Sequence, residues 1–180
     1  MTRIARPIFA LVPLFLLALA VTARAQENAQ PKKPPTPTEA ILANWNDVGN
    51  RLVTMAEDWP EDKYDYKLAP TTRTFQEVIL HVAGSNYDMI NRMAKSKVGD
   101  GRNDPAVADY KTKAATVAFL KKSIADGAAQ AKKQGDAGVV NLLEYWVGYT
   151  EHMGEHYGLL VAYYRASGQV PPESRPKDKK

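Results

Sequence analysis

Apolar residues recur at steps of three and four in four long segments of this chain, and stretches rich in proline, glycine and polar residues separate the segments. This spacing is the period of an α-helix that buries one face. No segment shows the alternation of apolar and polar residues that is typical of a half-buried strand. The sequence therefore predicts an all-α fold, a four-helix bundle with one core and no second domain.

Residues that cap or break helices mark the limits of the first two. Thr38 is predicted to cap the first helix, which stops near Pro60. Thr74 and Glu77 form the clearest start in the sequence, a capping box whose hydroxyl and carboxylate satisfy free backbone amides of the second helix. A glycine- and proline-containing loop at residues 97–105 follows that helix.

A second glycine-rich break, at residues 135–138, separates the last two predicted helices. The third is predicted over about residues 112–133 and the fourth over about residues 139–166, followed by Gly168 as its C-terminal cap. The fourth helix is apolar on most of its circumference. It is therefore predicted to be the most buried of the four.

The first 25 residues have the organisation of a secretory signal peptide. Two arginines precede an apolar run at residues 7–21, and an Ala-Arg-Ala motif at residues 23–25 is a typical cleavage site. The run contains Pro13 and is shorter than the roughly 20 apolar residues of a spanning helix. The sequence predicts cleavage before Gln26 and export to the periplasm or the exterior, free of the membrane; an uncleaved anchor is the alternative.

The remainder of the chain divides into a linker, one domain and a tail. Four prolines predict an extended linker at residues 26–37. The bundle is predicted over residues 38–174, which is long enough to enclose a substantial core. Residues 175–180 are predicted to be a charged, solvated tail.

Charge and composition exclude several functions. The chain has 24 basic and 20 acidic residues, but residues 1–25 contain three arginines and no acid, so the predicted mature chain carries a net charge of only +1. Without a clustered basic surface, the sequence predicts no binding to nucleic acid. The chain has no cysteine, which excludes disulfides, thiolate nucleophiles and Cys-type zinc sites.

Histidine carries the candidate chemistry, and the chain has three. His152 and His156 are four residues apart on the fourth predicted helix, so their imidazoles can converge on one point. His81, on the second helix, completes the set if the two helices are neighbours. Three imidazoles with a position left open are typical of a catalytic metal site. The alternative is that the histidines are surface or hydrogen-bonded residues without a common ligand.

The neighbours of this pair add two further predictions. Gly148 and Gly158 each cost about 1 kcal/mol relative to alanine inside a helix, which indicates either close helix approach or space for a ligand. Glu155, three residues from His152, is the candidate general base or hydrogen-bond partner of a ligand. A solvated surface carboxylate is the alternative role for Glu155.

Residues 73–83 and residues 152–172 resemble the two motifs of the DinB/YfiT-like metalloenzyme superfamily. The second segment contains an HxxxH pair, a Tyr-Arg, a glycine and a Pro-Pro in the order and spacing of that family. The resemblance covers about residues 38–174. It implies a four-helix bundle in which the three histidines hold one divalent ion, usually zinc or nickel. Some members are similar to thiol-dependent transferases, but the predicted export makes a thiol cofactor less suitable here.

Two functions remain open from the sequence. The first is a metal-dependent enzyme of hydrolase or transferase type that acts on a small molecule by Lewis-acid activation of water or of a substrate heteroatom, with Glu155 or a tyrosine hydroxyl moving protons. The second is a non-catalytic bundle with a structural or vestigial metal site. Such a bundle could form a homodimer through the apolar surface of the fourth helix.

Overall fold

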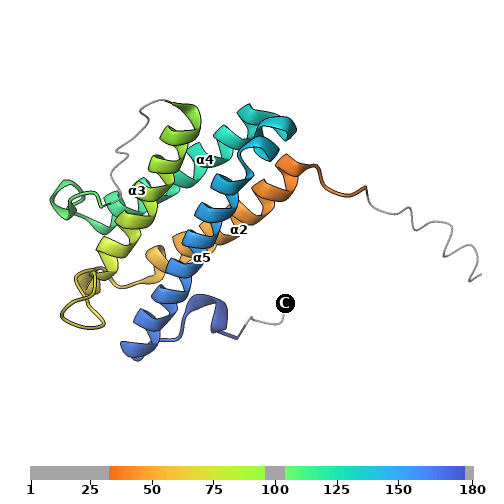
Figure 1. The fold of residues 1–180 in the computed structure, drawn as a ribbon. Helices are drawn as coiled ribbons and strands as arrows, with labels where there is room; N and C mark the ends of the chain where they lie inside the picture. The colour runs from red at the N-terminus through yellow and green to blue at the C-terminus, as the bar shows by residue number, and fades with distance from the viewer. Residues whose placement is uncertain (1–32, 96–103, 177–180) are drawn as a thin grey trace, which may run out of the picture. The chain divides into compact units, whose positions relative to one another are not determined.

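The computed structural model describes residues 33–95 and 104–176 (Figure 1). The chain divides into two units, residues 1–34 and residues 35–180, and every described helix belongs to the second. The predicted signal peptide, most of the predicted linker and loop, and the last four residues of the predicted tail lie outside the described residues. No helix in the described part of the chain has the length and apolar character needed to span a bilayer.

The described unit is all-helical, as the sequence predicts. The only β pairing among the described residues is one isolated bridge between Lys67 and Thr74. Three 3-10 helices lie in the connections: η1 (Glu61–Lys63), η2 (Val107–Asp109) and η3 (Pro172–Ser174). The four long helices are α2 (Pro37–Asp58), α3 (Phe75–Ala94), α4 (Lys113–Asn141) and α5 (Leu143–Ala166).

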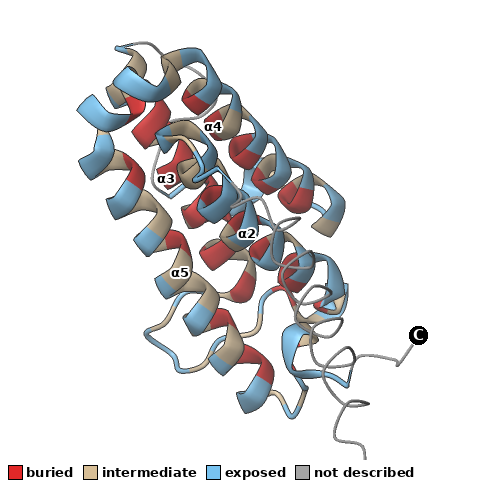
Figure 2. Ribbon diagram, turned by 90° about the vertical axis from the view of Figure 1, so that its right-hand side faces the viewer, coloured by how far each residue is buried: buried red, intermediate tan, exposed pale blue. Residues whose placement is uncertain are grey.

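Packing among these helices makes α3 and α5 neighbours. Helix α2 packs against α4 and α5, and α3 packs against the same two helices (Figure 1). Consecutive helices α2 and α3 therefore occupy opposite corners of the bundle. Buried positions line the sides of the helices that face one another (Figure 2). The two helices that carry the histidines thus share one groove.

Three of the predicted helix ends are confirmed. The Thr74 hydroxyl accepts a hydrogen bond from the Glu77 amide at 3.1 Å, and the Thr74 amide donates to the Glu77 carboxylate at 2.6 Å. Thr112 caps α4 through the amide of Ala115. Gly168 follows α5 with a φ of +78°, a conformation that favours glycine.

The predicted cap of the first helix, Thr38, is wrong. The cap is Thr36, which forms a complete capping box with Glu39 and places Pro37 in the first turn. Proline fits there because its missing N–H needs no partner and its φ is already helical. The Thr38 amide instead donates to the Asp136 carboxylate at 3.0 Å.

The predicted start of the fourth helix at residue 139 is also wrong, although the preceding break is correct. Gly135 has φ +62° and ψ −178°, which interrupts α4. Helical structure then resumes and continues to Asn141, and a second break at Leu142 (φ −115°, ψ 23°) precedes α5. Two breaks therefore separate the long helices where the sequence indicated one.

Helix α3, and not α5, is the most buried member. Twelve residues of α3 are buried, compared with five of α5. Helix α3 is covered by α4, by α5 and by the segment that contains η2. Apolar residues at the start of α5 instead remain open to solvent, including Leu143 and Val147. The prediction that the fourth helix is the most buried, based on its apolar residues on most sides, is therefore wrong.

Aromatic side chains fill the core at two places. The rings of Trp59 and Phe75 stack at 4.3 Å between centroids, and Tyr64 packs edge-on against Phe75 at 5.4 Å. Elsewhere Trp45 and Trp146 meet edge-to-face at 5.6 Å, and both are completely buried. Such pairs add stabilisation beyond the area that they bury. The tyrosine-rich connection after α2 thus packs against the bundle.

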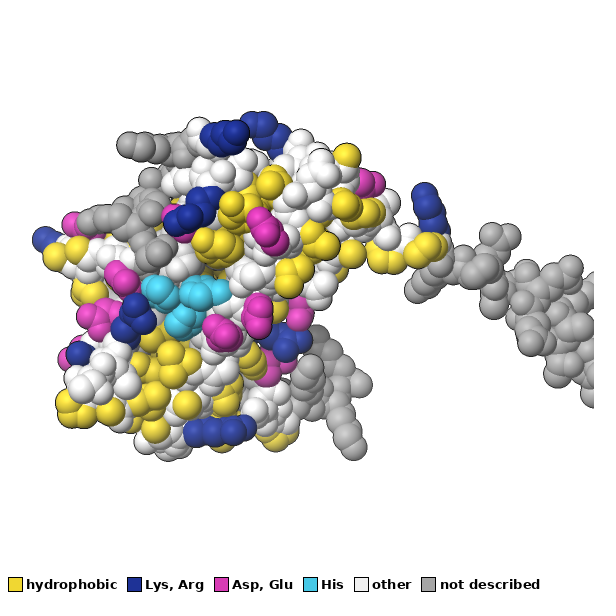
Figure 3. All heavy atoms as spheres, in the orientation of Figure 1, with side chains coloured by type: hydrophobic (Ala, Val, Ile, Leu, Met, Phe, Trp, Pro, Cys, Tyr) yellow, Lys and Arg dark blue, Asp and Glu magenta, His cyan; other side chains and the backbone are white. Residues whose placement is uncertain are grey.

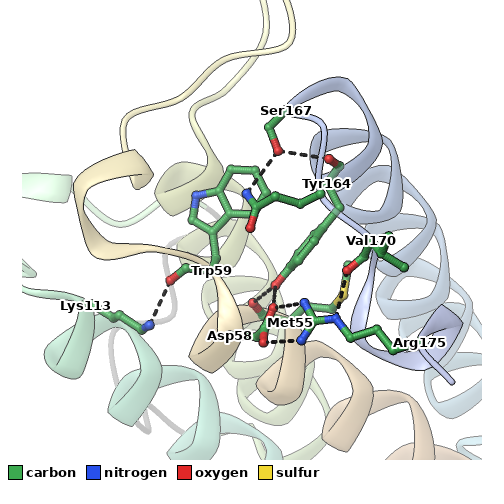
Figure 4. A network of polar contacts seen from close by, with 9 residues as sticks. Met55, Asp58, Trp59, Lys113, Tyr164, Ser167, Val170 and Arg175 are labelled. Carbon is green, nitrogen blue, oxygen red and sulfur yellow. Dashed lines mark hydrogen bonds and ion pairs between the residues drawn. The ribbon is translucent and has the colours of Figure 1, made fainter. Parts of the chain in front are cut away.

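A polar network anchors the chain end after α5 (Figure 4). The buried Tyr164 hydroxyl lies 2.8 Å from the Met55 carbonyl oxygen and 3.0 Å from Asp58 Oδ2. Arg175 donates to both oxygens of Asp58, at 2.7 and 2.5 Å. The Arg175 guanidinium thereby holds the pKa of Asp58 below its usual value. Arg175, in the predicted tail, therefore contacts the bundle.

We expect Tyr164→Phe to lower the free energy of unfolding by about 1 kcal/mol, because it leaves the Met55 carbonyl and the Asp58 carboxylate without a buried donor. Urea denaturation measures the loss. The control is Tyr157→Phe, since the Tyr157 hydroxyl has no hydrogen bond to any described residue. Equal stability of the two variants would contradict a stabilising role for the network.

Candidate metal centre

The three histidines meet in the groove between α3 and α5. His81 comes from the middle of α3, and His152 and His156 lie one turn apart on α5. The Nε2 atom of His152 is 3.1 Å from Nε2 of His81 and 3.1 Å from Nε2 of His156. The side chains form one continuous patch on the surface (Figure 3). The convergence that the sequence predicted is therefore present.

The donor set fits one divalent ion. One nitrogen from each histidine lies within 4.8 Å of the other two. Two imidazole nitrogens bound to zinc at 2.0–2.1 Å in tetrahedral geometry are separated by about 3.3 Å, close to the two measured Nε2 separations. All three side chains are half-buried, so the group could hold a metal ion while one side stays open to solvent.

The protonation state also suits a metal ligand, which must be a neutral imidazole. Burial, reinforced by the neighbouring imidazoles, lowers the pKa of His156 to about 4. Burial and His81 likewise lower the pKa of His152. The Nδ1 atoms of both residues are buried and have no hydrogen-bond partner among the described residues. A second proton on either ring is therefore unfavourable, and both rings are neutral at pH 7.

We expect the metal-free protein to lose stability as the pH falls from about 6.5 towards 4. In this window the unfolded chain binds a proton at His156 that the folded chain does not, so the free energy of unfolding decreases. After allowance for solvent screening at a half-buried site, the loss should be about 1–2 kcal/mol. Urea denaturation at pH 7.5 and pH 5 in the presence of a chelator measures it. His156→Gln should remove most of this pH dependence, and an unchanged slope would contradict the assignment.

Asp104 is a further residue of the site, which the sequence did not indicate. Its Oδ1 atom lies 3.1 Å from Nδ1 of His81 and 2.9 Å from a terminal guanidinium nitrogen of Arg73. A carboxylate on the outer nitrogen orients an imidazole and directs its Nε2 towards a metal. Asp104 is 23 residues from His81, within the connection between α3 and α4, so no periodic spacing links the two.

We expect Asp104→Asn to weaken zinc binding about tenfold, because substitution of such a partner leaves the ligands in place but removes the group that orients one of them. Competition with a chromophoric chelator measures the affinity. Asp47→Asn is the control, since Asp47 is an exposed aspartate that pairs with Arg51 on α2. Equal affinities for the two variants would show that Asp104 does not position His81.

Glu155, the candidate general base, is exposed on α5. Its charge favours protonation of His152, although burial has the larger and opposite effect on that pKa. Neither ring nitrogen of His152 contacts Glu155. Nε2 lies near the other two histidines, and Nδ1 has no partner among the described residues. A direct hydrogen bond from His152 to Glu155 is therefore absent from the described part, and the role of Glu155 as a base stays a prediction.

A cavity of about 540 Å³ adjoins the histidines along the same groove. A Cβ atom added at Gly148 or at Gly158 would meet nothing within 4 Å. Close helix approach is therefore not the reason for glycine at either position. Gly148 lines the cavity, which agrees with the other prediction, space for a ligand. The cavity is lined by His81 and Ser85 from α3 and by Glu144, Tyr145, Gly148, Tyr149 and His152 from α5.

The three histidines could hold a metal ion, and a cavity lies next to them. Functional assignment rests on this geometry and on the sequence motifs, since a comparison with protein-family models and a search of curated proteins both find no match for the chain.

Proposed function

We propose that this protein is a metal-dependent enzyme of hydrolase or transferase type, in which His81, His152 and His156 hold one divalent ion. The observation that carries the proposal is the convergence of three imidazoles, from two helices, within 4.8 Å. Their half-buried position beside a cavity favours an open site over a closed structural one. The motifs at residues 73–83 and 152–172 support membership of the DinB/YfiT-like superfamily and a zinc or nickel ion.

Each residue of the site has a distinct task in this proposal. A divalent ion bound to the histidines supplies Lewis-acid chemistry, which polarises a substrate heteroatom or lowers the pKa of water. Asp104 holds the His81 ring through Nδ1. Burial keeps His152 and His156 in the neutral form that donates a lone pair. The cavity gives a small molecule access to the same point.

Metal content tests the proposal most directly. The protein is expressed with its own leader, purified without chelator and examined by elemental analysis. We expect close to one equivalent of zinc or nickel. Removal of the metal should lower the thermal midpoint, and zinc or nickel, but not magnesium, should restore it, since imidazole ligands favour these ions. A protein that contains no metal and shows no shift with either ion would contradict the proposal.

A non-catalytic bundle that dimerises is the second candidate. Leu143 and Val147, one turn apart on α5, are 45% and 52% exposed, and Val140 nearby is 54% exposed. Exposed apolar residues in one region are typical of an interaction surface. Sedimentation analysis distinguishes the candidates when combined with the metal measurement: a dimer whose stability does not respond to metal supports the second.

A further inference from the structure

The cavity beside the histidines has the features of a substrate pocket. Its volume of about 540 Å³ lies in the range of small-molecule sites. Ser85 lies one turn after His81 on α3, and Gly148 lies one turn before His152 on α5. The cavity therefore begins at two of the three candidate metal ligands and extends along the groove towards the start of α5.

Ser85 is a polar group in this wall without a partner. The residue is 4% exposed, and its hydroxyl makes no hydrogen bond to any residue in the described ranges. Its oxygen is not among the fully buried polar atoms that lack a partner, so it keeps contact with the solvent of the cavity. A ligand in the cavity can therefore form a hydrogen bond with this hydroxyl.

Gly148 is the residue of α5 in the cavity lining that has no side chain to occupy the cavity. Glycine is an unfavourable residue inside a helix, and a Cβ here would project into empty space. Tyr145, three residues before Gly148, and Tyr149, the residue after it, also line the cavity. The Tyr149 hydroxyl is bound to Asp88 at 2.8 Å, so Tyr149 contributes ring carbons to the wall. The space is thus suited to a flat, apolar group between aromatic side chains.

The charge of the lining restricts the ligand further. Among the residues that line the cavity, Glu144 is the only acidic one, and none is a lysine or an arginine. A bound ion on the histidines would attract one metal-binding group of the ligand. A second anionic group at the far end would lie near the Glu144 carboxylate, and no residue of the lining would offset its charge. The nearby Arg92 is already paired with Asp88.

We propose that this cavity binds the substrate of the metal site, and that the substrate is a small molecule with a flat apolar body, one metal-binding group and no second negative charge. Ser85 binds the end of the substrate next to the metal ligands, and Gly148 admits its body. This inference rests on the proposed metal-dependent function.

The test uses the full-chain protein loaded with zinc and three hydroxamates, titrated by calorimetry. Acetohydroxamate provides the metal-binding group alone, benzohydroxamate adds a flat apolar body, and 4-carboxybenzohydroxamate adds a second anion. We expect benzohydroxamate to bind at least tenfold more tightly than acetohydroxamate, and the carboxylated compound at least fivefold more weakly than benzohydroxamate. Zinc retention is checked after each titration.

Two glycines of α5 provide a matched pair of variants. Gly148→Leu fills the cavity and should weaken benzohydroxamate at least tenfold while acetohydroxamate changes less than twofold. Gly158→Leu places the same side chain at another open glycine, outside the lining, and should leave both affinities unchanged. Ser85→Ala should weaken both compounds about fivefold.

The outcomes separate the two proposals. If the protein binds no zinc, or if acetohydroxamate does not bind the zinc-loaded protein, the proposed function fails and the pocket assignment fails with it. If acetohydroxamate binds but benzohydroxamate is no tighter, or if the two leucine variants behave alike, the substrate pocket is wrong and the metal site stands.

Discussion

Replacing His152 by alanine should weaken zinc binding by a factor of about 1,000 or more, while the helical fold remains. The Nε2 atom of His152 lies 3.1 Å from the corresponding atoms of both His81 and His156, so it is the candidate ligand in contact with both of the others. Its removal leaves two ligands on different helices. Structural zinc sites provide roughly 10–16 kcal/mol from three or four ligands, so one ligand accounts for several kcal/mol.

Calorimetric titration of the chelator-treated protein with zinc measures this loss, and circular dichroism with thermal unfolding reports the fold. Glu151→Ala is the matched control, because it changes the adjacent, exposed residue of the same helix. Zinc affinity within fivefold of the original protein would contradict the three-histidine site. If His152→Ala instead unfolds the protein, and zinc does not stabilise the original protein, the histidines are structural.

Gly127→Ala should lower the free energy of unfolding by about 3 kcal/mol. The added Cβ would lie 2.4 Å from Cζ2 and 2.8 Å from Cε2 of Trp45. That indole cannot move away easily: it is completely buried, its N–H donates to the Ile124 carbonyl at 2.9 Å, and its ring packs against Trp146. Forcing extra volume into a packed core typically costs 1–3 kcal/mol, and disturbance of a buried hydrogen bond adds to this.

Gly158→Ala provides the comparison within the same protein. Its Cβ would meet nothing within 4 Å, so only the better helix propensity of alanine remains, and stability should rise by about 0.5–1 kcal/mol. Urea denaturation measures both variants at pH 7.5. The same substitution of alanine for glycine should therefore lower the free energy of unfolding at position 127 and raise it at position 158. A Gly127→Ala protein as stable as the original would show that α2 and α4 are not in close contact at Trp45.

Local signals determined the helices of this protein. The capping box at Thr74 and Glu77, the helix start near Thr112 and Gly168 as a C-terminal cap all depend on residues within one turn of each other, and all three are confirmed. The error at Thr38 has a local cause as well. Thr36 has a glutamate three residues later, Glu39, and so can form a capping box, which Thr38 cannot. Pro37 was assigned to the linker, although proline is favoured in the first turn of a helix.

The candidate site was determined by the sequence only in part. The four-residue spacing of His152 and His156 places both on one side of a helix without any tertiary information. The distance of 3.1 Å from His81 to His152, in contrast, exists because α3 and α5 are neighbours while α2 and α3 are not. Helical periodicity identifies a buried face but does not say which helix covers it.

Glycine and aspartate show most clearly what only the tertiary structure decided. The sequence identified Gly148 and Gly158 as costly in a helix, and both face open space. The described glycines that permit close helix packing include Gly127, against Trp45, and Gly49, against Ile124. Asp104 contacts His81 from within the connection between α3 and α4, 23 residues away. Helix propensity and capping act over a few residues and can be read along the chain. Contacts between distant segments depend on how the helices pack, which no local pattern specifies.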